Sequence, residues 1–317
     1  MTVDPWLIAL IVIFGVLMLY LGLSIILYRK IFLRAGYQRD AFIDQDDPFF
    51  KPSFQWYERS PKETVKIKAY DNTPLSGVFL PSFDDKSTQT AIVLHGYQSR
   101  HEDLIAIAKM YSDMGFKILL VDQRGHGDSG GQFTSFGHFE KMDLKKWILY
   151  VVKTYGANEK ILLHGVSLGA STVMLASELA LPDQVRLVVA DSGFTSLPKL
   201  FFNNMKIKLG VLFFPGIDCV LYFMHRYLLC QVSPIHAVKK SHIPIVFLHG
   251  EADREVPVSM ANSLHEASGA SFKELYLVPD APHGKAYVFD KQGVEQHLFA
   301  IIRAKFEIKK SIAKQMK

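Results

Sequence analysis

Apolar and polar residues alternate along most of this chain of 317 residues, but one N-terminal segment is apolar throughout. The segment from Trp6 to Tyr28 contains no charged residue. As a helix it would extend over about 34 Å, enough to cross the hydrocarbon core of a bilayer. Since such a segment has no polar face, it predicts a transmembrane helix rather than a buried core helix. A cleaved signal peptide is disfavoured, because residues 1–5 contain no Lys or Arg and no A-x-A cleavage site follows.

From residue 65 onward, short runs rich in β-branched and aromatic residues alternate with helical stretches. The predicted strands are Val65–Tyr70, Leu75–Pro81, Thr90–His95, Ile118–Asp122, Lys160–His164, Val185–Ala190, Ile243–His249 and Glu274–Val278. The predicted helices lie near Glu102–Met114, Gly137–Thr154, Leu168–Glu178, Val258–Ala267 and Gly293–Lys309. This alternation predicts an α/β fold with a mostly parallel sheet covered by helices. The turn at residues 71–74 (Asp-Asn-Thr-Pro) predicts that the first two strands pair antiparallel.

About fifty residues separate the strand ending at Ala190 from the strand beginning at Ile243, more than one crossover helix requires. We predict a helical cap inserted at about residues 195–240. The cap core, Leu200–Cys230, is rich in large apolar side chains: Phe201, Phe202, Leu212, Phe213, Phe214, Tyr222, Phe223 and Met224. Such a segment is either a lid over an acyl-binding pocket or a pair of helices packed on the body, and its place in the chain favours the lid.

Length and composition are compatible with one large core, since 49% of the residues are hydrophobic and 21% are charged. We therefore expect a transmembrane anchor at residues 1–30, a juxtamembrane linker at 31–60, a single domain containing the cap at 61–310, and a basic tail at 311–317.

The net charge of +5 has two main sources. One group follows the apolar segment and comprises Arg29, Lys30, Arg34 and Arg39. By the positive-inside rule, this group predicts a single-pass membrane protein whose domain lies in the cytoplasm. The other group, near the C-terminus, is either a membrane-surface patch or an ordinary solvated helix face: Arg303, Lys305, Lys309, Lys310, Lys314 and Lys317. No basic stripe interleaved with aromatic residues is present, so a nucleic-acid partner is not expected.

The only two cysteines, Cys219 and Cys230, would lie about 16 Å apart along one helix, too far for a disulfide. We interpret them as buried thiols. No C-x-x-C or histidine-rich spacing suggests a metal site, and neither a metal nor a cofactor is expected.

A G-x-S-x-G pentapeptide, Gly165 to Gly169, directly follows the predicted strand Lys160–His164. Between a strand and a helix, this pattern is typical of a nucleophile elbow, in which glycines on both sides allow a tight and strained turn at the central Ser167. The following helix begins with the backbone N–H of Leu168, which can stabilise an oxyanion. Ser167 is therefore the candidate nucleophile.

A serine nucleophile needs a general base and a carboxylate that orients the base. Asp253 and His283 follow later strands, so the order is Ser, Asp, His, and the carboxyl ends of parallel strands meet at one edge of the sheet. Two other interpretations compete with Asp253 as the acid: Asp253 can simply cap the next helix, and Asp191, after the preceding strand, can supply the carboxylate instead. Of the other histidines considered, two fall in predicted helices and two stand beside turn glycines: His265, His297, His126 and His164.

The second oxyanion donor is expected after the strand Thr90–His95, where Gly96 lets the backbone approach and the amide of Tyr97 can donate. The Tyr97 ring itself reaches the oxyanion or packs against the cap; the residues leave both possibilities open.

Taken together, these motifs and the sequences His95-Gly96, Asp122 to Ser129, His249 to Asp253 and Pro282 to Gly284 resemble the α/β-hydrolase superfamily. More narrowly, they resemble a bacterial membrane-anchored, esterase-like branch related to serine aminopeptidase S33 and BEM46-type hydrolases. The resemblance covers roughly residues 60 to 310. It implies an eight-stranded α/β-hydrolase sheet, a triad of Ser167, Asp253 and His283, an oxyanion hole from Tyr97 and Leu168, and a structural role for the Arg124–Ser129 loop. The His-Gly-Gly-Gly loop of many lipases is missing, so lipase activity is not implied.

We therefore expect a serine hydrolase that cleaves carboxylic esters or thioesters through an acyl-enzyme on Ser167. The phenylalanine-rich cap and the membrane helix suggest an apolar acyl chain on a small-molecule or lipid-derived substrate, and the same features would suit a hydrophobic peptide. Two alternatives remain: a serine amidase or peptidase, which the same triad supports, and a non-enzymatic membrane-bound scaffold with the hydrolase fold. The substrate-binding residues and the oligomeric state are not predictable from the sequence.

Overall fold

The computed structural model describes residues 4–34, 43–204 and 208–306. Eight strands form its single sheet, in the spatial order β1-β2-β4-β3-β5-β6-β7-β8. Their bounds are β1 Glu63–Lys68, β2 Pro74–Leu80, β3 Gln89–Leu94, β4 Lys117–Val121, β5 Lys160–Val166, β6 Val185–Asp191, β7 Ile245–Gly250 and β8 Lys273–Val278. Strand β2 pairs antiparallel with β1 and β4, and the other neighbours are parallel. The predicted eight-stranded, mostly parallel sheet and its antiparallel first pair are confirmed.

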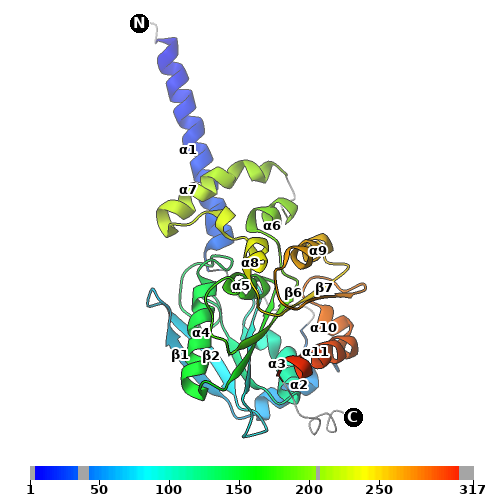
Figure 1. Ribbon diagram of the computed structural model, residues 1–317. Helices are drawn as coiled ribbons and strands as arrows, with labels where there is room; N and C mark the ends of the chain where they lie inside the picture. Colours follow the sequence, from blue (N-terminus) through cyan, green and yellow to red (C-terminus); the bar gives the residue numbers. More distant parts are fainter. Residues whose placement is uncertain (1–3, 35–42, 205–207, 307–317) are drawn as a thin grey trace.

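Helices cover both faces of the sheet (Figure 1). One layer contains α2 (Lys51–Arg59), α3 (Ile105–Asp113), α10 (Ala286–Phe289) and α11 (Lys291–Phe306), and the other contains α4 (Glu140–Tyr155), α5 (Leu168–Ala176), α8 (Pro234–Lys240) and α9 (Val258–Ala267). Strand β3 illustrates the alternation that drives this packing: Ala91 and Val93 belong to one buried cluster, Ile92 and Leu94 to the other. The sheet thus buries both faces, as parallel sheets do.

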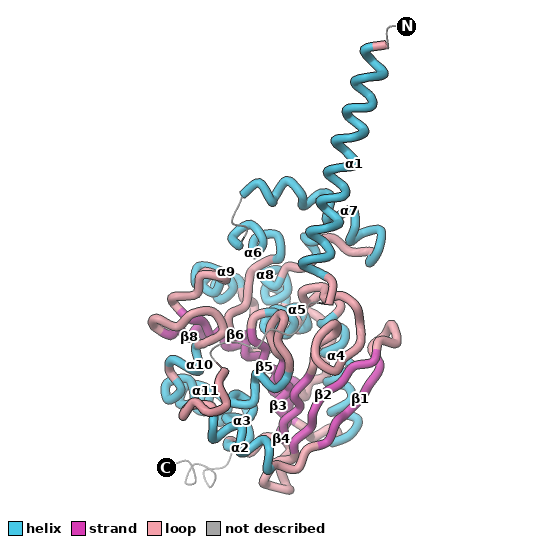
Figure 2. The backbone as a smooth tube through the Cα atoms, turned by 180° about the vertical axis from the view of Figure 1, so that it is seen from behind, coloured by secondary structure: helices cyan, strands magenta, loops and turns pink. Residues whose placement is uncertain are grey.

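A helix of 28 residues, α1 (Pro5–Phe32), projects from the body (Figures 1 and 2). Asp4 caps its N-terminus: the Asp4 carboxylate accepts a hydrogen bond of 3.0 Å from the Trp6 amide. In the described part of the chain, it is the one helix long and apolar enough to cross a membrane. The predicted N-terminal apolar helix is therefore present.

The last turns of α1 enter the folded body. Tyr28 and Phe32 are fully buried there, and the Phe32 ring lies edge-on against Phe136 and Phe201. After the helix, the Arg34 guanidinium donates hydrogen bonds to the carbonyl oxygens of Gly127 (2.6 Å) and Ser129 (3.0 Å). The end of α1 is thus part of the hydrophobic core of the domain, although the expected anchor ended at residue 30.

The insertion between β6 and β7 contains α6 (Leu197–Asn204), η2 (Lys208–Phe213), α7 (Phe214–His225), η3 (Leu229–Gln231) and α8. Helix α6 lies above the carboxyl end of β6, whereas α7 packs across α1 (Figures 1 and 2). The Tyr20 hydroxyl donates to the Leu212 carbonyl oxygen (2.8 Å) and accepts from the Gly216 amide (3.0 Å). The middle of the insertion, η2 and α7, therefore lies against α1, whereas α6 and α8 at its two ends lie on the body.

The prediction of buried thiols is wrong. Cys219 lies on α7 and Cys230 on η3, and both are exposed. The reason is that α7 buries its other side against α1 and the body, and its apolar outer side is left uncovered. Several predicted charges fall outside the described residues, namely Arg39, Lys309, Lys310, Lys314 and Lys317, as does the tail at 311–317.

Candidate active site

Ser167 lies in the tight turn between β5 and α5, with backbone angles φ 55° and ψ −110°. A side chain on Gly165 would collide with the backbone of Gly169, and one on Gly169 would collide with the Leu94 carbonyl oxygen. Both positions therefore need glycine for a close backbone approach. The strained conformation directs the serine above the carboxyl edge of the sheet, as expected for a nucleophile elbow.

Three side chains distant in sequence meet at this edge. The Ser167 Oγ lies 2.8 Å from Nε2 of His283, and Nδ1 of His283 lies 2.7 Å from Oδ2 of Asp253. With the imidazole proton on Nδ1, the serine hydroxyl donates to Nε2 and the imidazole donates to the carboxylate. The three residues are arranged for general-base activation of the hydroxyl.

The carboxylate of Asp253 is buried and also shapes its own loop. Its Oδ1 accepts hydrogen bonds from the amides of Glu255 (2.9 Å) and Val256 (2.8 Å), just before α9. The loop-capping interpretation and the triad interpretation both describe this residue, because each uses a different carboxylate oxygen. The loop hydrogen bonds fix the orientation of the oxygen that faces His283.

Electrostatics favour the ion pair of the triad. Burial by itself would raise the pKa of Asp253, but hydrogen bonds from His249 and His283 hold this pKa well below its usual range. Burial would lower the pKa of His283, yet the hydrogen bond and the charge of Asp253 outweigh burial and raise it above 6.5. The imidazole is therefore a stronger base than an isolated histidine.

The alternative acid, Asp191, has a different environment at the end of β6. Its Oδ1 accepts a hydrogen bond of 2.8 Å from the Ser192 hydroxyl, and burial raises its pKa to about 6. In the described part of the chain, Asp191 forms no hydrogen bond with His283. Of the two candidate acids, Asp253 is therefore the one that contacts His283.

The other histidines weighed from the sequence have different partners. His164 lies against the Tyr111 hydroxyl (2.7 Å) inside the core, and His126 lies near the Arg124 carbonyl oxygen (3.0 Å). His265 and His297 lie on α9 and α11.

Two backbone segments with candidate oxyanion amides lie beside the Ser167 hydroxyl. Leu168 is the first residue of α5, so its N–H has no carbonyl one turn earlier in the helix. A Cβ built on Gly96 would lie 3.9 Å from the Ser167 Oγ, so the backbone that leads to the Tyr97 amide lies beside the nucleophile. The arrangement suits an oxyanion hole of two amides.

The Tyr97 side chain has a partner that the sequence did not indicate. Its hydroxyl donates a hydrogen bond of 2.9 Å to the carbonyl oxygen of Ile31, and its ring stacks on Phe136. The phenol therefore supports the end of α1 instead of pointing at the oxyanion.

His95 holds the loop that carries this amide. Burial lowers the pKa of His95 to about 3, so the ring is neutral at physiological pH. Its Nδ1 donates to the Gly96 carbonyl oxygen (2.7 Å), and its Nε2 accepts from the amide of Gln123 (3.0 Å). The Gln123 side chain in turn bonds to the His95 carbonyl oxygen and to Thr172 on α5. Both oxyanion segments are thereby tied together.

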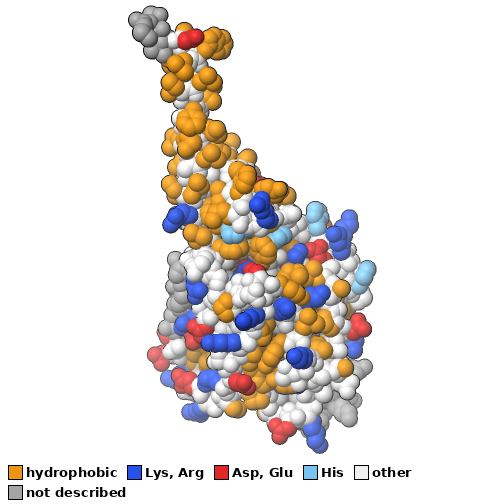
Figure 3. All heavy atoms as spheres, turned by 90° about the vertical axis from the view of Figure 1, so that its left-hand side faces the viewer, with side chains coloured by type: hydrophobic (Ala, Val, Ile, Leu, Met, Phe, Trp, Pro, Cys, Tyr) orange, Lys and Arg blue, Asp and Glu red, His pale blue; other side chains and the backbone are white. Residues whose placement is uncertain are grey.

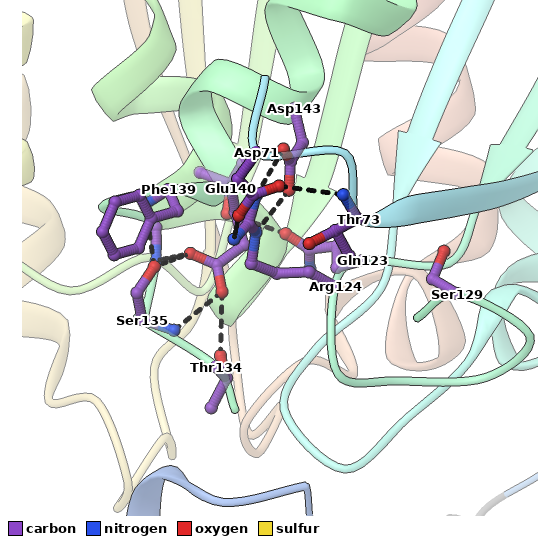
Figure 4. A network of polar contacts seen from close by, with 12 residues as sticks. Asp71, Thr73, Gln123, Arg124, Ser129, Thr134, Ser135, Phe139, Glu140 and Asp143 are labelled. Carbon is purple, nitrogen blue, oxygen red and sulfur yellow. Dashed lines mark hydrogen bonds and ion pairs between the residues drawn. The ribbon is translucent and has the colours of Figure 1, made fainter. Parts of the chain in front are cut away.

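The loop that begins at Arg124 is held by buried charges (Figure 4). The Arg124 guanidinium donates to both carboxylate oxygens of Asp143 (2.6 and 2.7 Å) and to Asp71 (2.9 Å). Nearby, the buried Glu140 carboxylate accepts from Thr134, Ser135 and Gly137. These contacts support the structural role that the resemblance implies, and they fix the adjacent segment that carries Phe136.

His249 was missed as a site residue by the sequence reasoning, although it stands four residues before Asp253. Its Nε2 lies 2.8 Å from the Val256 carbonyl oxygen and 3.3 Å from the Oδ2 of Asp253. The His249 ring therefore packs against the Asp253 carboxylate and against the loop that follows it. The i, i+4 spacing to the acid was the available signal.

Two cavities flank the nucleophile. The acyl cavity, as we name the larger one, measures about 470 Å³ and is mainly apolar, lined by Leu27, Ile31, Phe136, Phe194, Leu200 and Phe201 beside Ser167 and His283. The second cavity measures about 240 Å³, shares Ser167 and His283, and carries more polar groups, including Ser99 and Asp103. The acyl cavity falls in the size range of pockets for small-molecule ligands, about 300–1,000 Å³.

Part of the acyl cavity comes from α1. Leu27, Lys30 and Ile31 line it, and none of them was predicted as a site residue. Because the segment before Tyr28 is apolar on every side, its periodicity contains no signal for the side that faces a pocket.

Comparison with known proteins identifies sequences that are similar to this chain. The profile of the family described as "Serine aminopeptidase, S33" matches residues 85–214. The Bacillus subtilis protein YqkD is 26% identical over 237 residues, covering 74% of this chain and 77% of YqkD. The Schizosaccharomyces pombe protein bem46 is 24% identical over 231 residues, covering 72% of this chain and 73% of bem46.

Among solved structures, the Pyrococcus furiosus esterase Pf2001 superposes with a TM-score of 0.65 at 22% sequence identity. The superposition covers 86% of this chain and 99% of the esterase. At this identity, the likeness establishes the α/β-hydrolase fold.

Proposed function

Because the chain belongs to the α/β-hydrolase superfamily and is related to serine aminopeptidase S33 and Bem46 proteins, we propose that it is a serine hydrolase that cleaves carboxylic esters or thioesters. The observation that carries the proposal is the continuous chain of hydrogen bonds from Ser167 through His283 to Asp253. Esterases among its structural neighbours support the same reaction class.

In the first half of the reaction, the Ser167 oxygen attacks the acyl carbon while Nε2 of His283 takes the hydroxyl proton. The developing oxyanion accepts hydrogen bonds from the amides of Tyr97 and Leu168. Asp253 stabilises the imidazolium. The tetrahedral intermediate then collapses, the bond to the leaving group breaks, and His283 returns the proton to the leaving alcohol or thiol.

In the second half, a water molecule replaces the leaving group beside His283. Nε2 takes a proton from the water, the oxygen attacks the acyl-enzyme, and the Ser167 oxygen leaves with that proton. The products are a carboxylic acid and the regenerated enzyme, and no cofactor is needed for the atoms to balance.

The two cavities suggest how an ester lies across the nucleophile. The acyl cavity is apolar and suits the acyl chain, and the more polar second cavity suits the leaving alcohol next to His283. This assignment favours substrates with an apolar acyl group, whether small-molecule or lipid-derived.

We also propose that α1 anchors the enzyme in a membrane, with the hydrolase domain on the cytoplasmic side. The helix is 28 residues long, and the exposed cations Arg29 and Lys30 follow its apolar stretch.

A serine amidase or peptidase is the second candidate, favoured by the match to a family described as an aminopeptidase. Amide cleavage requires protonation of a much poorer leaving group. A matched pair of substrates, one amide and one ester with the same acyl group, separates the candidates: a peptidase turns over both efficiently, and an esterase turns over the ester alone.

The experiment uses the full chain in detergent micelles or nanodiscs, because the end of α1 lines the acyl cavity. We expect hydrolysis of short aryl esters and covalent labelling by a fluorophosphonate probe, and Ser167→Ala should abolish both. Ser171→Ala is the matched control: this serine is buried one turn later on α5, and within the described residues its hydroxyl forms no hydrogen bond. If wild-type protein is neither active nor labelled, the scaffold alternative is correct.

A further inference from the structure

Helix α7 has an apolar outer side. The exposed residues Pro215, Cys219, Tyr222 and Phe223 recur at helical spacing, so they form one side of the helix. Phe223 is 69% exposed, and the neighbouring Met224 and Leu212 are each 62% exposed. The opposite side is apolar as well and is buried through Gly216, Ile217 and Leu221. A helix that is apolar on both sides and uncovered on one is unusual on a surface facing water.

The position of α7 relative to α1 is fixed by direct contacts. The Tyr20 hydroxyl bonds to the backbone at both ends of the η2–α7 junction, and the Tyr28 hydroxyl lies 2.6 Å from Nε2 of His225. At Gly216, any side chain would collide with the Ser24 hydroxyl group. Helix α7 therefore lies against α1 between Tyr20 and Tyr28, farther from the sheet than α6 and α8 (Figure 1).

The length of α1 determines how deep this contact lies in a membrane. Residues 6–19, before the first contact with α7, are 14 residues and extend over only about 21 Å. A span of the hydrocarbon core needs roughly 20 residues, or about 30 Å. If α1 crosses the bilayer, the segment from Tyr20 to about Ile26 must lie within the hydrocarbon region too. The α7 contact begins in that segment.

The distribution of apolar and charged side chains on the surface agrees with this depth in the membrane. Apolar side chains cover α1 and continue onto the top of the body, whereas charged side chains are spread over the rest of this face (Figure 3). Arg226 follows the apolar side of α7 and is exposed, a position that suits the level of the lipid headgroups.

We propose that the outer side of α7 is embedded in the same membrane leaflet as the segment of α1 from Tyr20 to about Ile26, and that the acyl cavity receives its substrate from that leaflet. The substrate class would be a membrane-resident lipid ester. This inference rests on the proposed function for the identity of the reaction and on the α1 anchor for the position of the bilayer.

The route from the leaflet to the nucleophile follows one stripe of α1. Leu23, Leu27 and Ile31 stand four residues apart, so they lie on one side of the helix. Leu23 is 40% exposed, whereas Leu27 and Ile31 line the acyl cavity together with Leu200 and Phe201 of α6. An acyl chain that enters along this stripe meets mainly apolar side chains until its ester group reaches Ser167.

The first test measures the depth of α7 directly and does not depend on activity. In a Cys219→Ser/Cys230→Ser background, a nitrobenzoxadiazole probe is attached at Phe223→Cys in the full chain, which is reconstituted in phosphatidylcholine nanodiscs. Lipids that carry a nitroxide on the acyl chain should quench this probe strongly.

A probe at Phe83→Cys is the matched control. Phe83 is 59% exposed and follows β2 at the end that pairs with the start of β4, the edge of the sheet opposite the nucleophile. This probe should stay unquenched. Equal quenching at the two positions, or none at either, would overturn the embedding of α7.

The second test compares two substrates of the double variant Phe223→Asp/Met224→Asp in nanodiscs. Turnover of a long-chain lipid ester in the bilayer should fall by about tenfold or more, because charges displace the cap from the leaflet. Turnover of a water-soluble short ester should stay within about twofold, since neither residue touches the site. An equal effect on both substrates would reject entry from the membrane. If the wild type cleaves neither ester, the proposed function fails, whereas the quenching result still decides the position of α7.

Discussion

The Tyr97 hydroxyl donates a hydrogen bond of 2.9 Å to the carbonyl oxygen of Ile31, and so connects a candidate oxyanion residue to the last turn of α1. The two residues are 66 positions apart in the sequence, and the hydrogen bond joins two segments that line the same cavity. A phenol engaged in this way leaves the backbone amide, not the ring, as the group available to the oxyanion.

The role of the Tyr97 hydroxyl therefore predicts how far kcat/KM falls when the hydroxyl is removed. Tyr97→Phe removes one hydrogen bond to a carbonyl and keeps the amide, so we expect kcat/KM for a short ester to fall by less than about tenfold. If the hydroxyl instead stabilised the oxyanion, the loss would be about 100- to 1,000-fold. Tyr276→Phe is a control that should leave kcat/KM unchanged, because it removes a hydroxyl on β8 that donates to Asp290 after α10.

Substitution of the two candidate acids should lower kcat by very different factors. Asp253→Asn should lower kcat by about 10,000-fold, because the amide no longer favours the tautomer with the proton on Nδ1 of His283. Asp191→Asn should lower kcat by less than about tenfold, since the Asp191 carboxylate bonds to Ser192. Steady-state kinetics on one aryl ester measures both variants. The reverse order of effects would move the acid role to Asp191.

The pH dependence follows from the environment of His283. Asp253 raises the pKa of His283 above 6.5 despite burial, and the base acts in its neutral form. We expect kcat/KM to be low in acid, to rise through one inflection above pH 6.5 and then to level off. Asp253→Asn removes the largest contribution that raises this pKa and leaves burial in place, so the residual activity should have its inflection at lower pH. An inflection that does not move would show that another group titrates.

The sequence predicted the sheet and the meeting of the triad residues for a local reason. Each strand is a short β-rich run, and Ser167, Asp253 and His283 follow the carboxyl ends of β5, β7 and β8. In a parallel sheet, such positions converge whatever the loops between them do. The glycines on both sides of Ser167 carried the same information, because only they permit the turn.

The contribution of α1 could not be predicted in the same way. A helix that is apolar on every side has no periodicity to indicate which side packs, so the burial of Phe32 and the cavity position of Leu27 depend on tertiary contacts alone. The error over Cys219 has the same origin, because α7 is apolar on its covered and uncovered sides. The pattern of apolar and polar residues shows which side of a helix packs in the core only when polar residues occupy the opposite side.

Because the end of α1 belongs to the hydrophobic core, substitutions at its two ends should affect the stability of the domain differently. Phe32 is 0% exposed and packs on Phe136 and Phe201, so Phe32→Ala should lower the free energy of unfolding by about 3–5 kcal/mol. Phe14 lies on the same helix and is 64% exposed, so Phe14→Ala should have no effect on the domain. Thermal unfolding of both full-length variants in the same detergent makes the comparison. Equal midpoints would mean that α1 is only tethered to the domain.

The position of Leu27 predicts a change in chain-length preference. Leu27→Trp adds bulk to the wall that α1 contributes to the acyl cavity, while Ser167 and its partners are untouched. We expect kcat/KM for a p-nitrophenyl ester with a long acyl chain to fall by about tenfold or more, because the added ring occupies the volume that the chain needs. The acetate ester, which fills only the space next to the nucleophile, should be cleaved within about threefold of the wild-type rate.

Ile26→Trp is the matched control for this change. Ile26 precedes Leu27 on α1, is 60% exposed and does not line the acyl cavity in the described structure, so the same added ring points away from the substrate. Both esters should be cleaved by Ile26→Trp as by the wild type. A long-chain ester that reacts equally well with Leu27→Trp would mean that the acyl chain lies elsewhere, and the second cavity beside Ser99 and Asp103 would then be the remaining candidate for it.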